Sequence, residues 1–261
     1  MLRASFLHGS PMSRIQKVSE KNRLVDAFEP AVRARIEPFI QSIDVDIGTV
    51  ICETGGQLDH VYFPENAVLS LLTVLEDGAE IETANIGSEG AYGVFNAVSS
   101  RPSFNRCLVQ MQGRLLRVPV QHIRWGFDNS EHMRRLLMTY SEMQISQIQQ
   151  SVACNARHST EERISRWLLV MADRAPGKEL PYTHEFLSSM LGANRKSVTL
   201  AAQALQTGGM IKYNRGRIRI VDRKGLERAS CECYSVVRGF EAFLASRPVG
   251  GRELKSKPRG R

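Results

Sequence analysis

The chain has 261 residues, of which 42% are hydrophobic, so it is long enough for two compact domains and too apolar for an intrinsically disordered protein. Its formal net charge of +8 is unevenly distributed: residues 159–261 carry 20 Lys and Arg against 10 Asp and Glu, whereas residues 1–158 carry 15 against 17. Positive charge concentrated in one part of a chain is typical of a surface that binds phosphates. The charge therefore indicates a nucleic-acid interface in the C-terminal part.

The start of the chain shows no targeting signal. The first residues lack the sustained apolar stretch of a signal peptide, and no segment reaches the roughly 18 apolar residues that a helix needs to span a bilayer. The five cysteines have no spacing typical of a disulfide framework, which favours a reducing compartment. We therefore expect a cytoplasmic protein without a membrane partner, and we expect residues 1–23 to form a flexible tail.

Short β-type runs separated by glycine dominate residues 24–128. After a short helical segment, runs such as HVYFP, AVLSLLTVL and RCLVQM alternate in polarity or carry β-branched residues, and Asp77-Gly78 lies between two such runs. Asp-Gly is a favoured hairpin turn. Many short strands closed by turns are typical of a small antiparallel barrel, so the sequence predicts an antiparallel jelly roll in this region.

A long uninterrupted helix is predicted for residues 129–156, because this stretch contains neither Gly nor Pro. Its apolar side chains would lie on more than one side of the helix. We therefore expect the helix to pack against its own barrel and also against a second copy of the chain. The residues expected in this homodimer seam are Met133, Leu137, Tyr140, Ile145, Ile148 and Val152.

Residues 157–228 predict a winged helix-turn-helix. A helix capped by Thr183, a turn at Gly192 and a second helix capped by Asn194 are followed by an alternating hairpin. The second helix begins with two cations, and this end enters the major groove in such motifs. A C-terminal helix and a basic tail are expected in residues 229–261. The residues expected to contact double-stranded DNA are Thr183, His184, Asn194, Arg195, Lys196, Ser197, Thr199, Gln203, Arg215 and Arg217.

The run from Thr183 through Leu191-Gly192-Ala193-Asn194-Arg195 to Val198, followed by Gly216-Arg217-Ile218, resembles the Crp/Fnr family of transcription factors. Weaker matches lie in the barrel, for example at Val61-Tyr62-Phe63. The resemblance covers about residues 24–244 of the sequence. It implies an α+β fold with a jelly-roll sensor domain, a long dimerisation helix and a C-terminal winged helix-turn-helix.

The resemblance also implies a function and roles for individual residues. It implies a homodimer that regulates transcription from a palindromic operator, with RNA polymerase and an unidentified small-molecule effector as candidate partners. By position, Thr183 and Ser197 would hold phosphates, Arg195 would read a base and Lys196 would occupy a second reading position. Family members commonly have an acidic residue at the position of Lys196, so their operator sequence is not expected here.

The sensor region departs from the family's cyclic-nucleotide cassette. That cassette has Gly-Glu-Leu followed by Arg-Ser or Arg-Thr, whereas this chain has Gly93-Val94-Phe95 and Arg106-Cys107. Without the acid and the hydroxyl, a bound phosphate would lose charge-assisted hydrogen bonds of about 1.5–3 kcal/mol each. We therefore do not expect a cyclic nucleotide. The candidate effector-binding residues are Glu89, Gly93, Arg106 and Cys107.

The sequence predicts no cofactor and no metal site. The iron–sulfur branch of the family needs an N-terminal cysteine cluster, and this chain has no cysteine before Cys52. Cys231 and Cys233 are expected on a helix, where such close positions do not face each other, so we interpret them as packing cysteines rather than ligands of a shared metal. The histidines show no ligand spacing.

Two other functions are weighed against a signal-dependent regulator. A constitutive DNA-binding protein would use the barrel only to dimerise. A cupin-like barrel enzyme with an appended nucleic-acid module would need several histidines and a carboxylate on adjacent strands, and the barrel offers only His60. We therefore expect no enzyme activity.

Overall fold

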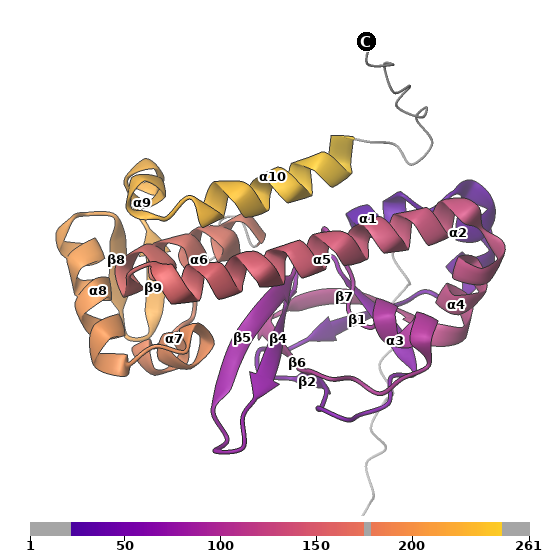
Figure 1. The fold of residues 1–261 in the computed structure, drawn as a ribbon, viewed down its shortest axis with the longest axis horizontal. Coiled ribbons are helices and arrows are strands. Elements are labelled where there is room, and N and C mark those ends of the chain that lie inside the picture. The colour runs from indigo at the N-terminus through magenta and orange to yellow at the C-terminus, as the bar shows by residue number, and fades with distance from the viewer. Residues whose placement is uncertain (1–21, 175–178, 247–261) are drawn as a thin grey trace, which may run out of the picture.

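A computed structural model of the chain describes residues 22–174 and 179–246 (Figure 1). An N-terminal β domain and a C-terminal helical region are joined by one long helix, α5 (Glu131–Arg157), which extends over both of them (Figure 1). The expected N-terminal tail falls, except for its last two residues, outside the described residues, as does the basic tail from residue 247.

The N-terminal segment is short and helical. It comprises α1 (Arg23–Asp26), α2 (Pro30–Ile36) and the 3-10 helix η1 (Glu37–Phe39). Asn22 caps α1 by accepting the N–H groups of Leu24 and Val25, and its amide donates to the carbonyl oxygens of Pro64 and Gly90. One buried side chain therefore both starts the helix and attaches it to the β domain.

The β domain consists of two antiparallel sheets. The first has the order β1 (Gln41–Val45), β7 (Gly113–Pro119), β3 (His60–Pro64), and the second has the order β2 (Val50–Cys52), β6 (Arg106–Met111), β4 (Val68–Val74), β5 (Glu80–Ile86). Register is set by pairs such as Ile43 with Leu115 and Leu71 with Ala84. The sheets do not close into a barrel, but their jelly-roll-like arrangement confirms the predicted fold class.

Helices close the end of the β domain nearest the start of α5. They are α3 (Val94–Ser99) and α4 (Val120–Asn129), and Ser130 then caps α5 by accepting the N–H of Met133. The 27 residues of α5 make it about 40 Å long. The long helix predicted between residues 129 and 156 is present with nearly those bounds.

One face of α5 is buried against the β domain. Met133, Leu137 and Tyr140 have exposed fractions of 0%, 1% and 2%, and the Tyr140 hydroxyl donates to the carbonyl oxygen of Ala91 at 2.8 Å. These three residues belong to the core of their own chain, so their predicted place in a homodimer seam is wrong. The hydrophobic pattern has two apolar faces, and it does not tell which of them covers the barrel.

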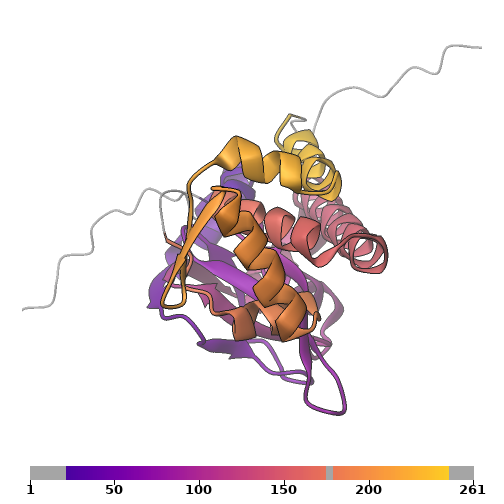
Figure 2. The same ribbon diagram turned by 90° about the vertical axis from the view of Figure 1, so that its left-hand side faces the viewer.

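The C-terminal region contains the predicted winged helix-turn-helix. Its elements are α6 (Thr160–Arg174), α7 (His184–Leu191), α8 (Arg195–Thr207), the hairpin β8 (Ile211–Asn214) and β9 (Arg217–Ile220), α9 (Arg223–Ala229) and α10 (Cys233–Ser246). In Figures 1 and 2, α10 runs beside α5, and the two helices are in contact.

The two regions share a core. Leu72 of β4 and Met111 of β6 belong to the same buried cluster as Trp167 of α6 and Leu187 of α7. At its edge lies the buried carboxylate of Glu82 on β5, which accepts a hydrogen bond from the indole of Trp167 at 2.8 Å. The helix-turn-helix is therefore held directly against the sheet.

Candidate nucleic-acid interface

Local capping interactions position α7 and α8 at a fixed angle. The Thr183 hydroxyl accepts the N–H of Phe186, and the Asn194 side chain accepts the N–H of Lys196. Between the helices, Gly192 adopts φ +55°, a left-handed conformation that favours glycine. These three residues were predicted as caps and turn, and each has that local role.

The exposed face of α8 begins with cations and is mostly polar, with Leu200, 58% exposed, as its large apolar side chain. Val198, Ala202 and Leu205 are buried, whereas the side chains of Arg195 and Lys196 lie in solvent at the N-terminal end of the helix. Ser197 and Gln203, also predicted to contact DNA, are exposed as well. This end of a helix carries partial positive charge and free N–H groups, which adds to the attraction for phosphate oxygens.

Arg195 forms an exposed ion pair in the free protein. Its guanidinium lies 2.6 Å from the Glu185 carboxylate of α7, and both side chains are about two-thirds exposed, at 69% and 67%. Such a surface pair contributes only about 0–1 kcal/mol. Arg195 can therefore exchange this partner for a base or a phosphate at small cost.

His184 joins α7, α8 and the hairpin. Its ring stacks on Tyr213 with centroids 4.3 Å apart, and Nδ1 lies 3.1 Å from the Thr199 hydroxyl. Burial, followed by the nearby Arg195 charge, lowers the pKa of His184 below its usual range. His184 and Thr199 are half-buried and in contact with each other. They therefore mainly hold α7 and α8 in position and add little exposed surface for DNA.

The hairpin continues the basic surface. Arg215 and Gly216 form its turn, with φ +45° and +76°, and the side chains of Arg215 and Arg217 are exposed. Arg217 lies 3.8 Å from Glu179, another weak surface pair. The ten residues predicted to contact DNA thus occupy one continuous region made of the start of α7, the outer face of α8 and the hairpin. Figure 2 views the molecule from this end.

The four candidate effector-binding residues are not brought together. Arg106 pairs with Glu80 and Glu53, and Cys107 is fully buried in the core of the β domain. Glu89 pairs with Arg174 of α6 at 2.7 Å; burial raises its pKa, but the Arg174 charge and the N–H of Gly87 outweigh this effect and lower it. These contacts do not assemble the four described residues into one site, and their role in effector binding stays a prediction.

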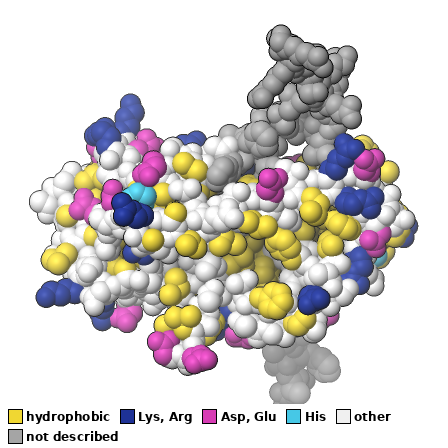
Figure 3. Space-filling model, in the orientation of Figure 1, with side chains coloured by type: hydrophobic (Ala, Val, Ile, Leu, Met, Phe, Trp, Pro, Cys, Tyr) yellow, Lys and Arg dark blue, Asp and Glu magenta, His cyan; other side chains and the backbone are white. Residues whose placement is uncertain are grey.

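A large cavity lies instead between the β domain and the outer face of α5. Its volume is about 950 Å³, and its lining includes Tyr92, Gly93 and Phe104 from the β domain with Met138 and Ile145 from α5. Gly93 is the only one of the four candidate effector residues in this lining. In Figure 3 the hollow lies within a band of hydrophobic side chains that follows α5.

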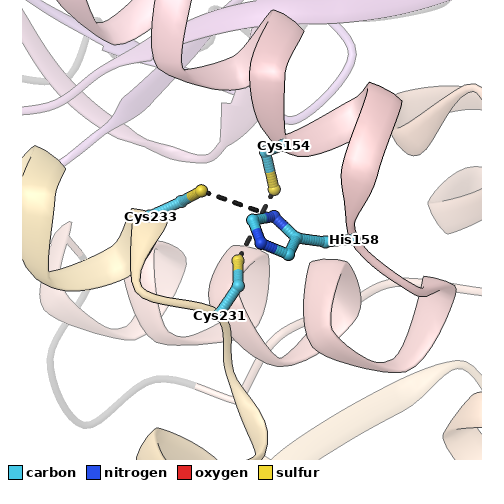
Figure 4. Close-up of side chains that lie close together, drawn as sticks. All are labelled: Cys154, His158, Cys231 and Cys233. Carbon is cyan, nitrogen blue, oxygen red and sulfur yellow. Dashed lines mark hydrogen bonds between the residues drawn. The ribbon is translucent and has the colours of Figure 1, made fainter.

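Four potential metal ligands converge at the other end of α5. They are Cys154, His158, Cys231 and Cys233 (Figure 4). The prediction that Cys231 and Cys233 lie together on one helix is wrong, because Cys231 precedes α10 and Cys233 is its first residue. A Cys-x₃-His spacing at residues 154–158 was the sequence signal that the prediction missed.

The fold and the basic surface define the class of protein. Two helices joined by a tight turn, an exposed second helix that starts with cations and a basic hairpin make a winged helix-turn-helix, which is a DNA-binding domain. Residues 162–229 match the family model described as the Crp-like helix-turn-helix domain.

Similar proteins with known roles agree with this class. The chain is 21% identical to the global nitrogen regulator of Synechocystis sp. over 214 residues, which are 78% of this chain and 94% of the relative. It is 20% identical to the global nitrogen regulator of Nostoc sp. over 212 residues, with the same coverage of both chains.

Solved structures share the fold. A Crp/Fnr family transcriptional regulator from Eubacterium rectale superposes with a TM-score of 0.65 at 19% identity, covering 79% of this chain and 97% of the other. FixK2 from Bradyrhizobium japonicum superposes with a TM-score of 0.63 at 15% identity, covering 74% and 98%. Residues 162–229 therefore form a Crp-like helix-turn-helix domain, which is a DNA-binding domain, and the chain as a whole has the fold of these Crp/Fnr regulators. Among the described residues, no helix is both long and apolar enough to cross a membrane.

Proposed function

We propose that the protein is a cytoplasmic homodimer that binds a palindromic operator and changes transcription in response to a small molecule. In this proposal residues 24–128 form the sensor domain, residues 129–156 the dimerisation helix and residues 157–228 the DNA-binding domain. The observation that carries the proposal is the exposed, cationic start of α8 beside a basic hairpin. RNA polymerase as a further partner stays a prediction.

The basic surface suggests how DNA is bound. Arg195 and Lys196 would enter the major groove, where Arg bonds both acceptors of a guanine edge and Lys contacts a base or a phosphate. Thr183 and Ser197 would hold phosphates at the edges of the groove. Arg215 and Arg217 would lie along the backbone of the neighbouring turn. The expected half-sites lie about 34 Å apart, one helical turn of DNA.

The unburied face of α5 supports a homodimer. Met138, Ile145 and Val152 recur every seven residues and are 60%, 48% and 65% exposed, and the half-buried Ile148 lies on the same side. Apolar residues at this spacing are typical of the seam between two parallel helices. We therefore propose that Met138, Ile145, Ile148 and Val152 form the homodimer seam. In this seam the face of α5 that carries them packs against the same face of α5 in the second copy.

The cavity favours a signal-dependent regulator over a constitutive one. Because Met138 and Ile145 belong both to its lining and to the proposed seam, a bound molecule would contact the surface that holds the two chains together. Aromatic and aliphatic side chains, Tyr92 and Phe104 among them, contribute much of the lining, so the effector is proposed to be a largely apolar molecule.

Salt-dependent DNA binding tests the proposal. Arg195→Ala, Lys196→Ala and Arg215→Ala are compared with wild type by fluorescence anisotropy on a preferred duplex and on an unrelated duplex. Arg135→Ala, which removes an exposed cation from the far end of α5, is the control. Each lost phosphate contact should flatten the slope of log affinity against log salt by about 1. A lost base contact should cost about 1–3 kcal/mol on the preferred sequence only. Equal binding by all five proteins would overturn the assignment.

A further inference from the structure

The four side chains at the α5–α6 junction come from segments that are far apart in the chain. Cys154 lies in the last turn of α5 and His158 is the C-cap of that helix, whereas Cys231 and Cys233 lie 77 residues and more beyond Cys154. Their ligand atoms all lie within 4.8 Å of one another, and all three cysteines are buried. In Figure 4 the three sulfur atoms and the imidazole point toward one shared centre.

The distances fit a metal ion better than a disulfide. The Cys154 and Cys231 sulfur atoms are 3.6 Å apart, far beyond the roughly 2.05 Å of a sulfur–sulfur bond. A tetrahedral zinc site with bonds of about 2.3 Å to sulfur places two sulfur ligands about 3.8 Å apart. The Cys233 sulfur and Nδ1 of His158 are 3.5 Å apart, which also matches a sulfur–nitrogen edge of such a tetrahedron.

The groups around the cluster are those that support metal ligands. Nε2 of His158 lies 3.2 Å from the Glu232 carboxylate, which would fix the imidazole with Nδ1 free to bind metal. The Gln150 amide donates to the Cys233 sulfur at 3.0 Å, as donors commonly do to thiolate ligands. A carboxylate paired with the second nitrogen of a ligand histidine is a recurring arrangement in zinc sites.

The local charge suits three thiolates. Zn²⁺ with three thiolates and a neutral imidazole carries a net charge of −1. Two arginines of α6, Arg163 and Arg166, are buried, each 8% exposed. A bound zinc–thiolate group would give these buried cations a compensating charge.

We propose that Cys154, His158, Cys231 and Cys233 bind one zinc ion in a closed structural site. Four protein ligands complete the tetrahedron and leave no position for a substrate, which is the pattern of structural rather than catalytic zinc. The ion ties the beginning of α10 to the junction between the long helix and the DNA-binding domain. It thereby fixes the direction in which α6, and with it the helix-turn-helix, continues from the end of α5.

Metal content of the intact protein tests this site. Untagged protein is purified with reductant, passed through chelator-treated buffer and analysed by mass spectrometry of the elements. Wild type should retain about one zinc ion per chain, and Cys154→Ser and Cys231→Ser should retain almost none. Cys52→Ser is the matched control, because Cys52 is also buried but lies on β2 in the other domain, and it should keep the zinc.

A second measurement needs no variant and stays informative if the serine proteins fail to fold. Wild type is stripped of metal, and thiol alkylation is followed residue by residue with and without added Zn²⁺. Zinc should protect Cys154, Cys231 and Cys233 and leave the alkylation of Cys52 and Cys107 unchanged. Co²⁺ in place of Zn²⁺ should give the visible absorption of a tetrahedral cobalt–thiolate site. Reduced wild type that takes up no zinc, or a Cys154–Cys231 disulfide in place of metal, would overturn the proposal.

Discussion

The buried carboxylate of Glu82 gives the sharpest prediction about what holds the two regions together. One of its oxygens accepts from Ser70 and Gln110, each at 2.7 Å, and the other accepts from Trp167 at 2.8 Å and Asn85 at 3.0 Å. Four donors, three from the β domain and one from α6, therefore depend on one side chain. Its removal is expected to weaken the contact between sheet and helix.

The magnitude follows from the donors left without an acceptor. In Glu82→Ala, the Ser70 hydroxyl can still turn to the Met190 sulfur, whereas the N–H groups of Trp167, Gln110 and Asn85 lose this acceptor, at about 1–3 kcal/mol each, which gives a loss of about 3–9 kcal/mol. The removal of a buried charge offsets part of this loss. In Glu82→Gln, the side-chain carbonyl still accepts from Trp167. A flip of the Gln110 amide turns its oxygen toward the new NH₂ group, which then donates to it. This variant is expected to stay within about 1 kcal/mol of wild type.

Urea unfolding monitored by tryptophan fluorescence measures both variants, and pH adds a second test. Burial raises the pKa of Glu82, so the native protein binds this proton more tightly than the unfolded chain does. The native state therefore loses stability relative to the unfolded state as pH rises above the unfolded value of about 4.3. Glu82→Gln does not titrate, so its stability relative to wild type should increase from pH 4 to pH 7. A loss below about 1 kcal/mol for Glu82→Ala, or equal losses for both variants, would refute the reasoning.

Three further predictions concern DNA binding, dimerisation and pH. Glu185→Gln releases Arg195 from its ion pair and removes a negative charge beside the DNA, so affinity for duplex DNA should rise by a factor of up to about 5 at low salt; unchanged affinity in a salt titration would contradict this role. Ile145→Glu places a charge in the proposed seam and should yield monomers in sedimentation equilibrium, whereas Val74→Glu should remain dimeric, because Val74 is a comparably exposed apolar residue (41% against 48%) away from α5. His184 has a lowered pKa through burial and then Arg195, so its contribution to stability is present above about pH 6.5 and is lost as pH falls below that value. Wild type should therefore lose more unfolding free energy between pH 7.5 and pH 5.5 than His184→Asn, and parallel losses would contradict the assignment.

Local signals in the sequence predicted the order of the elements because they act within a few residues. The left-handed turn at Gly192, the cap at Asn194 and the hairpin turn at Asp77-Gly78 each depend on the conformational preferences of one or two residues. The absence of Gly and Pro from residues 129–156 likewise sufficed to predict α5, which is observed at Glu131–Arg157. These preferences are enough to recognise a winged helix-turn-helix and an antiparallel sheet domain.

Relations between distant residues escaped the same reasoning. Met133 and Met138 are both apolar residues of α5, and only the position of the β domain decides that the first is buried and the second exposed. Cys154 and Cys231 meet because α10 folds back along α5, a contact that no local pattern encodes. The effector residues were placed by resemblance, and here Arg106 had already found partners in Glu80 and Glu53.

Selection of bound duplexes from a randomised DNA pool tests the central claim most directly. The wild-type protein is run beside Arg195→Ala and Lys196→Ala at one salt concentration, with and without cell extract as a source of the effector. Wild type should enrich an inverted repeat with half-sites about one helical turn apart, and each variant should relax the same position in both half-sites. Enrichment of no sequence under either condition, or of a single half-site that both variants still prefer, would contradict a dimer that reads DNA through α8.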